Sequence, residues 1–326
     1  MEKIQKEIKK RNPKISDSSV GAYCASLRQL QKLMGSSDLT KEDFENPKDI
    51  FELLETQKYT NNTYKNKLSA IISFLKAMDA PSELLAAYNE KIKTLKTSID
   101  MNNGKMKMSE KEDKNWMDYE QLQKFAAESI KKLPKTINNI DELMEWEKSV
   151  VLNFHTLYPL RNELADAKLV VVPKSKTIDS FEVNKKTESA DFNYIVLNQA
   201  ANWGYCIIKK YKTKKVYGDI KFSLDPKLLP LFFRYAKLLT AYKKQMDVTH
   251  DWFLMNRNYE KLTRNDFTRF MNDIFINTHK KISTTMIRKI VASHHYDGKG
   301  KDLKDLAHVM GHSTDTALKF YVKDDD

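Results

Sequence analysis

Three residues whose side chains can act on a phosphate ester follow one another near the C-terminus. Arg288 closes the run Ser283-Thr-Thr-Met-Ile-Arg288, His312 comes 24 residues later (312 − 288) and Tyr321 a further 9 (321 − 312). A guanidinium group binds a phosphate through two parallel hydrogen bonds, an imidazole donates or accepts a proton, and a phenol can act as a nucleophile. Each residue alone is more often a surface or packing residue, so only their joint order indicates a reactive site.

The charge of the chain favours a polyanionic partner. The 326 residues include 56 Lys+Arg and 44 Asp+Glu, which gives a net charge of +12. Residues 201–300 hold 20 basic and 8 acidic residues, a local excess of 20 − 8 = +12. A concentrated basic field is typical of DNA-binding proteins, although a Lys-rich solvated surface has the same composition.

Other classes of protein are excluded by composition and by missing motifs. The 15 Tyr, 15 Phe and 4 Trp exclude a wholly disordered chain, and no run approaches the ~20 apolar residues of a membrane span. The N-terminal sequence lacks the apolar core of a signal peptide. Cys24 and Cys206 cannot form a disulfide framework, which favours a reducing compartment. We therefore expect an intracellular protein with no membrane partner.

The sequence also predicts neither a cofactor nor a metal ion. It contains no Walker loop, no dinucleotide-binding glycine motif, no HExxH and no GxSxG. His308 and His312 have the i, i+4 spacing of a zinc pair, but no matching Cys or acidic ligands accompany them. The chemistry is therefore expected to depend on side chains alone.

Apolar periodicity predicts a small helical unit at the N-terminus. One helix should begin at Ser16 or Asp17 and end at Gly35, and others should cover residues near 50–54, 61–75 and 81–95. Residues 97–115 have no periodic apolar pattern and read as a linker. We therefore predict an all-α bundle over 1–98, a linker over 99–115 and a larger domain over 116–326.

The larger domain is predicted to be mainly helical with a small antiparallel sheet, an α+β arrangement. Helices are expected near residues 118–133, 140–158, 228–246, 263–278, 283–294, 302–310 and 315–321, and strands near 168–172, 193–197, 204–210 and 216–224. The last two strands flank the basic turn Tyr211-Lys-Thr-Lys-Lys215. They should therefore form a hairpin.

The C-terminal run resembles the final motif of the tyrosine recombinases, the integrase family of site-specific DNA recombinases. The segment LAHVMGHSTDTALKFYVK, residues 306–323, is similar to the family's last box almost throughout. Leu157-Tyr-Pro-Leu-Arg161 resembles the family's first Arg box, and the turn at Lys212 resembles the hairpin that carries the catalytic Lys. The resemblance covers the whole two-domain layout, and the last box is its most specific part.

The resemblance implies that Arg161, Lys212, Arg288, His312 and Tyr321 are the catalytic residues. Tyr321 would attack a DNA phosphodiester and form a 3′-phosphotyrosyl bond, which conserves the bond energy without ATP. The two guanidinium groups and His312 would donate hydrogen bonds to the pentacoordinate transition state. Lys212 would protonate the leaving 5′-oxygen.

Several neighbouring residues are alternatives or supports for this set. Lys210 and Lys214 are alternatives to Lys212, because the sequence does not fix the hairpin register. The acidic residue expected three after the first Arg is missing, and Glu163 or Asp166 could take its place beside that Arg. His308 is a further candidate for a supporting role near His312.

The chain departs from the family pattern at Thr285. The family has His or Lys three residues before the second Arg, whereas a Thr hydroxyl is a poor base at neutral pH. His294 and His295, further along the same helix, could substitute for it. The departure predicts an active but slow enzyme, with deprotonation of Tyr321 unassisted.

The family resemblance also implies partners and an assembly. Both domains would grip double-stranded DNA at sites with inverted repeats, and a homotetramer on two synapsed sites would exchange strands through a Holliday junction. The bias toward Lys, Asn and Ile is similar to that of integrases of viruses or mobile elements. Two alternatives stay open: a type IB topoisomerase, which relaxes DNA as a monomer, and a non-catalytic DNA-binding descendant of a recombinase.

Overall fold

The computed structural model describes residues 1–103, 107–296 and 303–323. The chain divides into two compact units, Met1–Lys105 and Met106–Asp326. Their boundary falls inside the predicted linker. None of the described helices has the length and apolar character needed to cross a membrane.

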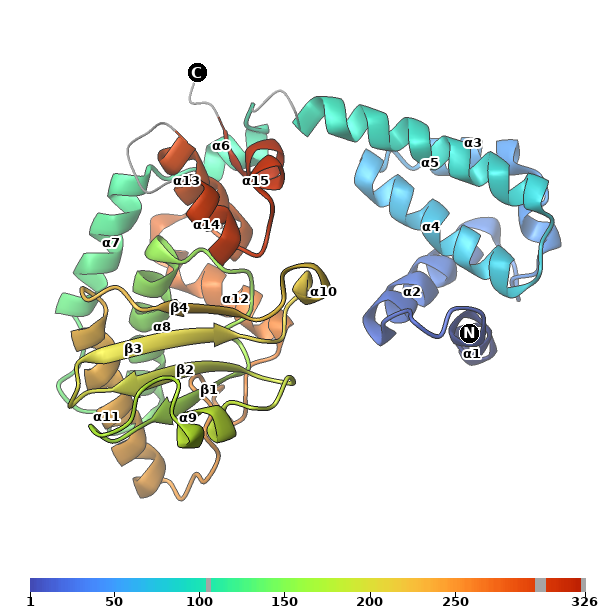
Figure 1. The fold of residues 1–326 in the computed structure, drawn as a ribbon. Coiled ribbons are helices and arrows are strands. Elements are labelled where there is room, and N and C mark those ends of the chain that lie inside the picture. The colour runs from blue at the N-terminus through green and yellow to red at the C-terminus, as the bar shows by residue number, and fades with distance from the viewer. Residues whose placement is uncertain (104–106, 297–302, 324–326) are drawn as a thin grey trace. The chain divides into compact units, whose positions relative to one another are not determined.

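The first unit is a helical bundle (Figure 1). Ser16 accepts a hydrogen bond from the Ser19 N–H at the start of α2, and Gly35, at φ 68°, ends that helix as predicted. Tyr88 is fully buried and donates to the Phe44 carbonyl at 2.9 Å. The elements are α1 (Glu2–Arg11), α2 (Asp17–Met34), the 3₁₀ turn η1 (Glu42–Phe44), α3 (Pro47–Thr56), α4 (Asn61–Ala77) and α5 (Ser82–Asn103).

Two features of this unit differ from the sequence-based expectation. α1 was not predicted, because most of its side chains are polar; its one buried residue is Ile8. α5 continues through the beginning of the predicted linker to Asn103. The end of the linker is helical as well, since α6 (Glu110–Asn115) begins with a capping box between Ser109 and Glu112.

The second unit is mainly helical and contains one four-stranded sheet in the order β1-β2-β3-β4. Its strands are β1 (Ala167–Val171), β2 (Asn193–Asn198), β3 (Trp203–Ile208) and β4 (Ile220–Ser223). β1 pairs with β2 in parallel, and the other two pairings are antiparallel. The prediction of a wholly antiparallel sheet was therefore wrong. Residues 172–192, which include α9 (Phe181–Lys186), form a crossover long enough to return the chain in the same direction.

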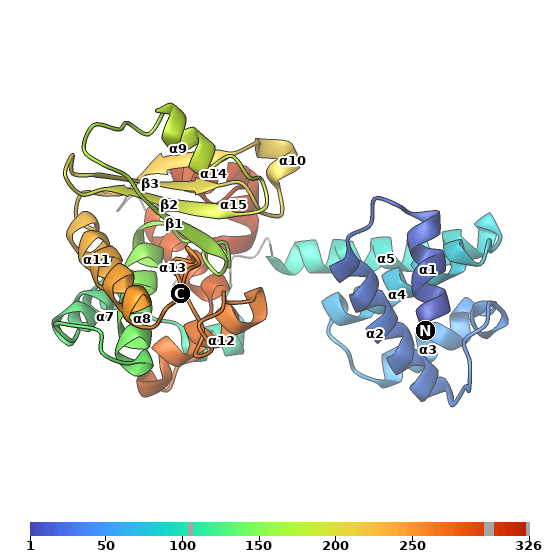
Figure 2. The ribbon, with the colours of Figure 1, turned by 90° about the horizontal axis from the view of Figure 1, so that it is seen from below.

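Helices cover both faces of this sheet, as Figure 2 shows. Ile195, Cys206 and Ile208 point into the main core with the long helices, while Val196 and Ile207 pack with Val183 of α9 on the other face. The helices are α7 (Tyr119–Lys131), α8 (Ile140–Leu157), α10 (Lys214–Tyr217), α11 (Leu229–Gln245), α12 (Arg264–Ile274), η2 (Ile276–Thr278), α13 (Thr284–Tyr296), α14 (Leu303–Val309) and α15 (Thr314–Tyr321). Most predicted helices of this unit are confirmed. The hairpin is confirmed too, but its second strand starts only at Ile220, because residues 214–217 form α10.

A buried carboxyl group in α8 makes the stability of the second unit depend on pH. Glu147 is fully buried, and its Oε1 accepts from the Met255 N–H at 2.8 Å and the Tyr235 hydroxyl at 3.3 Å. Burial raises the pKa of Glu147 to about 8. Because the folded pKa lies above the ordinary value of 4.5, stability should be full below pH 4.5 and should decline until pH 8.

Glu147→Gln should remove this decline and raise the unfolding free energy above pH 8 by a few kcal/mol, on the order of the linkage energy. Thermal unfolding at pH 5 and pH 9 measures the effect. Glu145→Gln on the exposed side of the same helix is the control, since Glu145 is exposed and pairs with Lys148 at 3.1 Å. Equal pH slopes in the two variants would contradict the assignment.

Candidate active site

Arg161 lies in the turn that follows α8, and backbone contacts hold this turn. His155, fully buried, has Nδ1 at 2.8 Å from the Val151 carbonyl and Nε2 at 3.5 Å from the Arg161 carbonyl. Burial lowers the pKa of His155 to about 4, so its ring is neutral. The Pro159 carbonyl accepts from Arg288 Nη1 at 2.7 Å. The backbone beneath the Arg161 guanidinium is thus tied to α8 and α13.

Arg288 is fully buried in the middle of α13. Besides Pro159, its guanidinium donates to the Met310 carbonyl at 3.4 Å and to His312 Nε2. Burial lowers the pKa of Arg288, and the positive charge of Arg161 lowers it further. The Tyr321 ring lies across this guanidinium, 4.6 Å from Cζ to the ring centroid. The buried cation is therefore fixed on several sides.

His312 and Tyr321 come from the turn and the helix at the end of the chain. Gly311 allows the turn after α14 because it adopts φ 68°, and Ser313 caps α15 by accepting from the Thr316 N–H. α15 then places Tyr321 9% exposed, with its ring centroid 5.4 Å from that of His312.

The two guanidinium groups converge on one nitrogen of His312. Arg161 Nη2 lies 2.9 Å from His312 Nε2, and Arg288 Nη2 donates to the same atom. Arg161 Nη2 also makes a long contact of 3.5 Å with the Tyr321 hydroxyl. Arg161, Arg288, His312 and Tyr321, which we call the Arg–His–Tyr cluster, are thus brought together from three distant segments.

The protonation state of His312 follows from these contacts. Burial lowers the pKa of His312 to about 3, and the charges of Arg288, Arg161 and Lys212 contribute further. The ring is therefore neutral, and Nε2 is an acceptor because both arginines donate to it. The sequence led us to expect His312 as a donor to phosphate. In the arrangement seen here, donation from Nε2 requires the guanidinium groups to turn away first.

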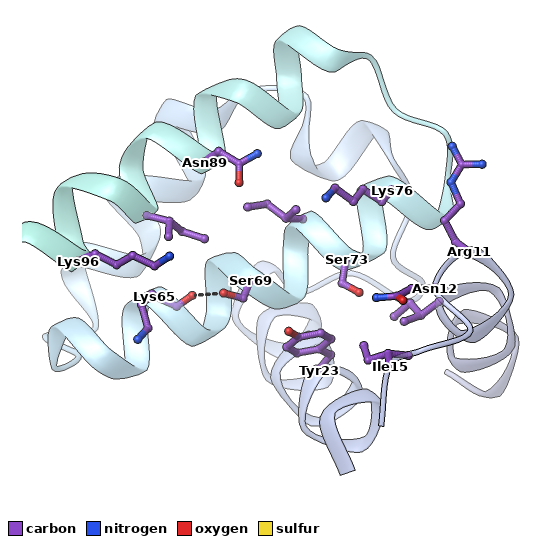
Figure 3. A pocket seen from close by; sticks show the side chains of 13 residues that line it. Arg11, Asn12, Ile15, Tyr23, Lys65, Ser69, Ser73, Lys76, Asn89 and Lys96 are labelled. Atoms are coloured by element: carbon purple, nitrogen blue, oxygen red, sulfur yellow. Dashed lines mark hydrogen bonds between the residues drawn. The ribbon is translucent and has the colours of Figure 1, made fainter. Parts of the chain in front are cut away.

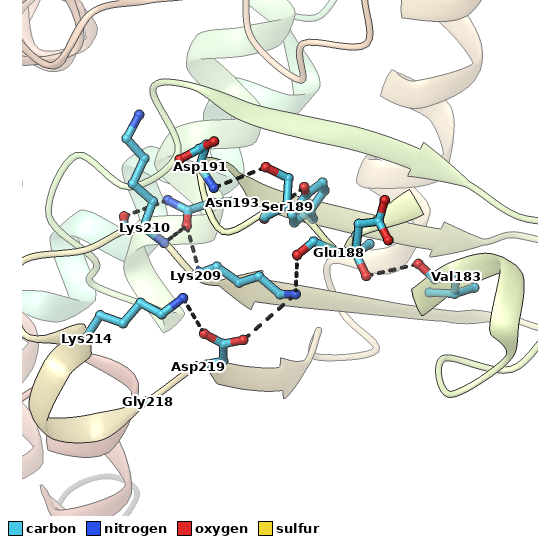
Figure 4. Close-up of polar contacts among 12 residues, drawn as sticks. Val183, Glu188, Ser189, Asp191, Asn193, Lys209, Lys210, Lys214, Gly218 and Asp219 are labelled. Carbon is cyan, nitrogen blue, oxygen red and sulfur yellow. Dashed lines mark hydrogen bonds and ion pairs between the residues drawn. The ribbon is translucent and has the colours of Figure 1, made fainter. Parts of the chain in front are cut away.

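Of the three candidate lysines, Lys210, Lys212 and Lys214, Lys212 is the one without a carboxylate partner among the described residues. Lys210 pairs with Asp166 at 2.6 Å. Lys214 pairs with Asp219 at 2.8 Å, as Figure 4 shows. Lys212 is exposed, and its charge lowers the pKa of His312. The geometry favours Lys212 over its two neighbours.

The predicted supporting residues are placed differently from the expectation. Asp166 forms an ion pair with Lys210 rather than with Arg161. The negative charge of Glu163 raises the pKa of Arg288. Neither acid forms an ion pair with Arg161 within the described part of the chain. Thr285 and His308 are both exposed, and among the described residues no hydrogen bond or ion pair joins either side chain to the cluster.

His294 and His295 lie elsewhere. His294 stacks on Tyr119 with ring centroids 4.0 Å apart, and its Nδ1 lies 3.6 Å from Glu120. Both histidines line a separate pocket of about 690 Å³. This placement does not support the hypothesis that His294 or His295 takes the place of the missing base.

Three residues near the cluster escaped the sequence reasoning. The buried Asn193 donates to the Glu163 carbonyl at 2.8 Å. Thr213 donates to the Gly311 carbonyl at 2.7 Å, and Asn162 accepts from Thr284 at 3.0 Å. Asn193 and Thr213 satisfy backbone carbonyls, and Asn162 pairs with the side chain of the first residue of α13. Their sequence signal is weak, because Asn and Thr are common in ordinary turns.

Comparisons with known proteins give likenesses in structure. No protein-family model matches the chain, and no curated protein matches it. Over the residues that the structure describes, no group of three or more His, Cys, Asp or Glu is placed to hold a metal ion. Among solved structures, the chain is similar to XerA recombinase, with 13% sequence identity and a TM-score of 0.43, over 99% of this chain and 94% of that chain.

Proposed function

We propose that this protein is a site-specific DNA recombinase that cleaves and rejoins DNA through a 3′-phosphotyrosyl intermediate. The observation that carries the proposal is the Arg–His–Tyr cluster. Two guanidinium groups converge on a single acceptor atom beside a tyrosine hydroxyl. An acceptor in that position is what a phosphoryl oxygen would provide, and guanidinium groups are the donors best suited to it.

The proposed reaction uses the cluster in the following way. A DNA phosphate displaces His312 Nε2 as the acceptor for Arg161 and Arg288, whose charges then stabilise the pentacoordinate transition state. The Tyr321 hydroxyl loses its proton to solvent, and its oxygen bonds to phosphorus while the bond from phosphorus to the 5′-oxygen breaks. Lys212 gives its proton to the leaving oxygen. Rejoining reverses these steps with a new 5′-hydroxyl, so that strands are exchanged.

The first unit offers a basic groove for the DNA backbone (Figure 3). The groove, about 530 Å³, runs along one stripe of α4 that carries Lys65, Ser69, Ser73 and Lys76, and α5 adds Lys96. The small hydroxyl residues in the middle allow close approach of a ligand. Lys76 and Lys96 have no side-chain partner among the described residues. Cations flanking a polar floor are suited to phosphate groups.

Replacing Lys65, Lys76 and Lys96 by Gln should weaken DNA binding and flatten its salt dependence. If each contacts one phosphate, the slope of log K against log salt should fall by about 2 to 3, at ~0.9 per phosphate. Fluorescence anisotropy at several salt concentrations measures the slope. A matched triple variant replaces Lys3, Lys32 and Lys48, which are exposed residues outside the groove, and should keep the wild-type slope. Equal slopes in the two triple variants would contradict the assignment.

Thr285 should contribute little to cleavage. Its side chain is exposed on the first turn of α13, so Thr285→Ala should leave the single-turnover rate within about threefold of wild type. Thr285→His should accelerate cleavage at neutral pH, because general-base assistance is worth ~10²–10⁴-fold. A complete loss in Thr285→Ala would instead make the hydroxyl a catalytic group.

A nicked suicide substrate and a pair of marked recombination sites test the function together. A recombinase traps a covalent adduct on the first substrate and exchanges flanks between the second. A type IB topoisomerase would trap the adduct and relax supercoiled DNA without exchange between defined sites. A non-catalytic descendant would bind DNA and give no adduct. Candidate sites come from inverted repeats in the source DNA.

A further inference from the structure

The β3–β4 loop, which carries Lys212, is anchored at its root by one buried amide. The Oδ1 of Asn193, a fully buried residue, accepts from the Lys209 N–H at 2.9 Å and the Lys210 N–H at 2.8 Å. Its Nδ2 donates to the Glu163 carbonyl at 2.8 Å. It also donates to the Lys210 carbonyl at 3.2 Å (Figure 4). The amide therefore joins the root of the loop to the segment that carries Arg161.

A second anchor follows Lys212 directly. The Thr213 hydroxyl donates to the Gly311 carbonyl at 2.7 Å, one residue before His312. A Cβ built at Gly311 would lie 2.8 Å from Cε2 of Tyr211, so the loop rests closely against this turn. The backbone of Lys212 is thus fixed on one side to the Arg161 segment and on the other to the His312 turn.

We infer that Asn193 and Thr213 are positioning residues for proton transfer by Lys212, an inference that rests on the proposed function. Among the described residues, neither side chain forms a hydrogen bond with Tyr321 or with either arginine guanidinium. An exposed lysine with no carboxylate partner samples many rotamers, so it can reach a leaving oxygen reliably only if its backbone is held. The two anchors supply that restraint, and they tie it to the two segments that hold the phosphate-binding groups.

The chemistry of the leaving group separates this role from a general structural one. During cleavage the 5′-oxygen departs as an alkoxide that needs the proton of Lys212. When a sulfur atom replaces that bridging oxygen, the departing thiolate is stable without a proton. A loss of cleavage rate that is caused only by a misplaced Lys212 should therefore appear with the oxygen substrate and be absent with the sulfur substrate.

The experiment measures single-turnover adduct formation on both substrates. Thr213→Val and Asn193→Ala should slow cleavage of the oxygen substrate by about 10-fold to 10²-fold and leave the sulfur substrate within about threefold of wild type. Lys212→Ala is the reference for this selective loss. Thr213→Val keeps the side-chain shape, so it tests the inference even if Asn193→Ala folds poorly.

The matched control lies at the other end of β2. Asn198 is also fully buried, and its side chain bonds the Pro173 and Lys176 carbonyls and the Ala201 N–H. Asn198→Ala should cost stability without changing the ratio of oxygen to sulfur rates. If Thr213→Val leaves the ratio of oxygen to sulfur rates unchanged, as equal losses on both substrates would, the inference is overturned. A wild-type chain that forms no adduct with either substrate would overturn the proposed function itself.

Discussion

Tyr321→Phe should abolish the covalent DNA adduct while leaving DNA affinity within about twofold of wild type, because only the nucleophilic oxygen is removed. The structure indicates that the packing of the aromatic ring is retained in this variant. The aromatic ring lies over the Arg288 guanidinium, 4.6 Å from Cζ, and phenylalanine retains that contact. Adduct on the suicide substrate is measured by gel shift under denaturing conditions, and affinity by fluorescence anisotropy.

Tyr296→Phe serves as the control for this substitution. Tyr296 ends α13 and is 46% exposed, so loss of its hydroxyl should change neither adduct formation nor binding. Adduct that persists in Tyr321→Phe would remove Tyr321 from the mechanism. A large loss of affinity would show that the tyrosine acts mainly in binding.

Arg161→Lys should lower the cleavage rate by about 10²–10³-fold, the usual effect of removing a preorganised donor from a charge-stabilising site. Lysine keeps the positive charge but cannot reproduce the fork that meets His312 Nε2 at 2.9 Å and the Tyr321 hydroxyl at 3.5 Å. Arg161 is partly exposed, so the midpoint of thermal unfolding should stay near that of wild type.

The control is Arg257→Lys, an exposed arginine that pairs with Asp141 at 2.7 Å. It should leave the rate unchanged. A wild-type cleavage rate in Arg161→Lys would contradict the prediction and would mean that positive charge alone suffices at this position. The corresponding change at Arg288 is a weaker test, because its guanidinium also holds the Pro159 and Met310 carbonyls and its loss should destabilise the second unit.

Much of the local structure was predictable, because it depends on neighbours along the chain. The Ser16 cap and the Gly35 stop of α2 agree with their sequence signals. The strand at Asn193–Asn198 shows the run of β-branched and aromatic residues that predicted it. Short polar helices such as α6, α9 and α10 were missed, since they bury few side chains and leave no apolar period.

The sequence by itself determined the residue types of the candidate site and their order, because the last motif spans a single turn and helix. Tertiary structure decided the rest. Packing of the turn after α8 against α13 brings Arg161 to His312, across 151 residues of chain. Among the three candidate lysines, the pairing of Lys210 and Lys214 with carboxylates leaves Lys212 without such a partner in the described part of the chain. Burial and two converging guanidinium groups make His312 a neutral acceptor. Such pairings depend on distances between segments remote in sequence, and only the folded packing of helices and sheet sets those distances.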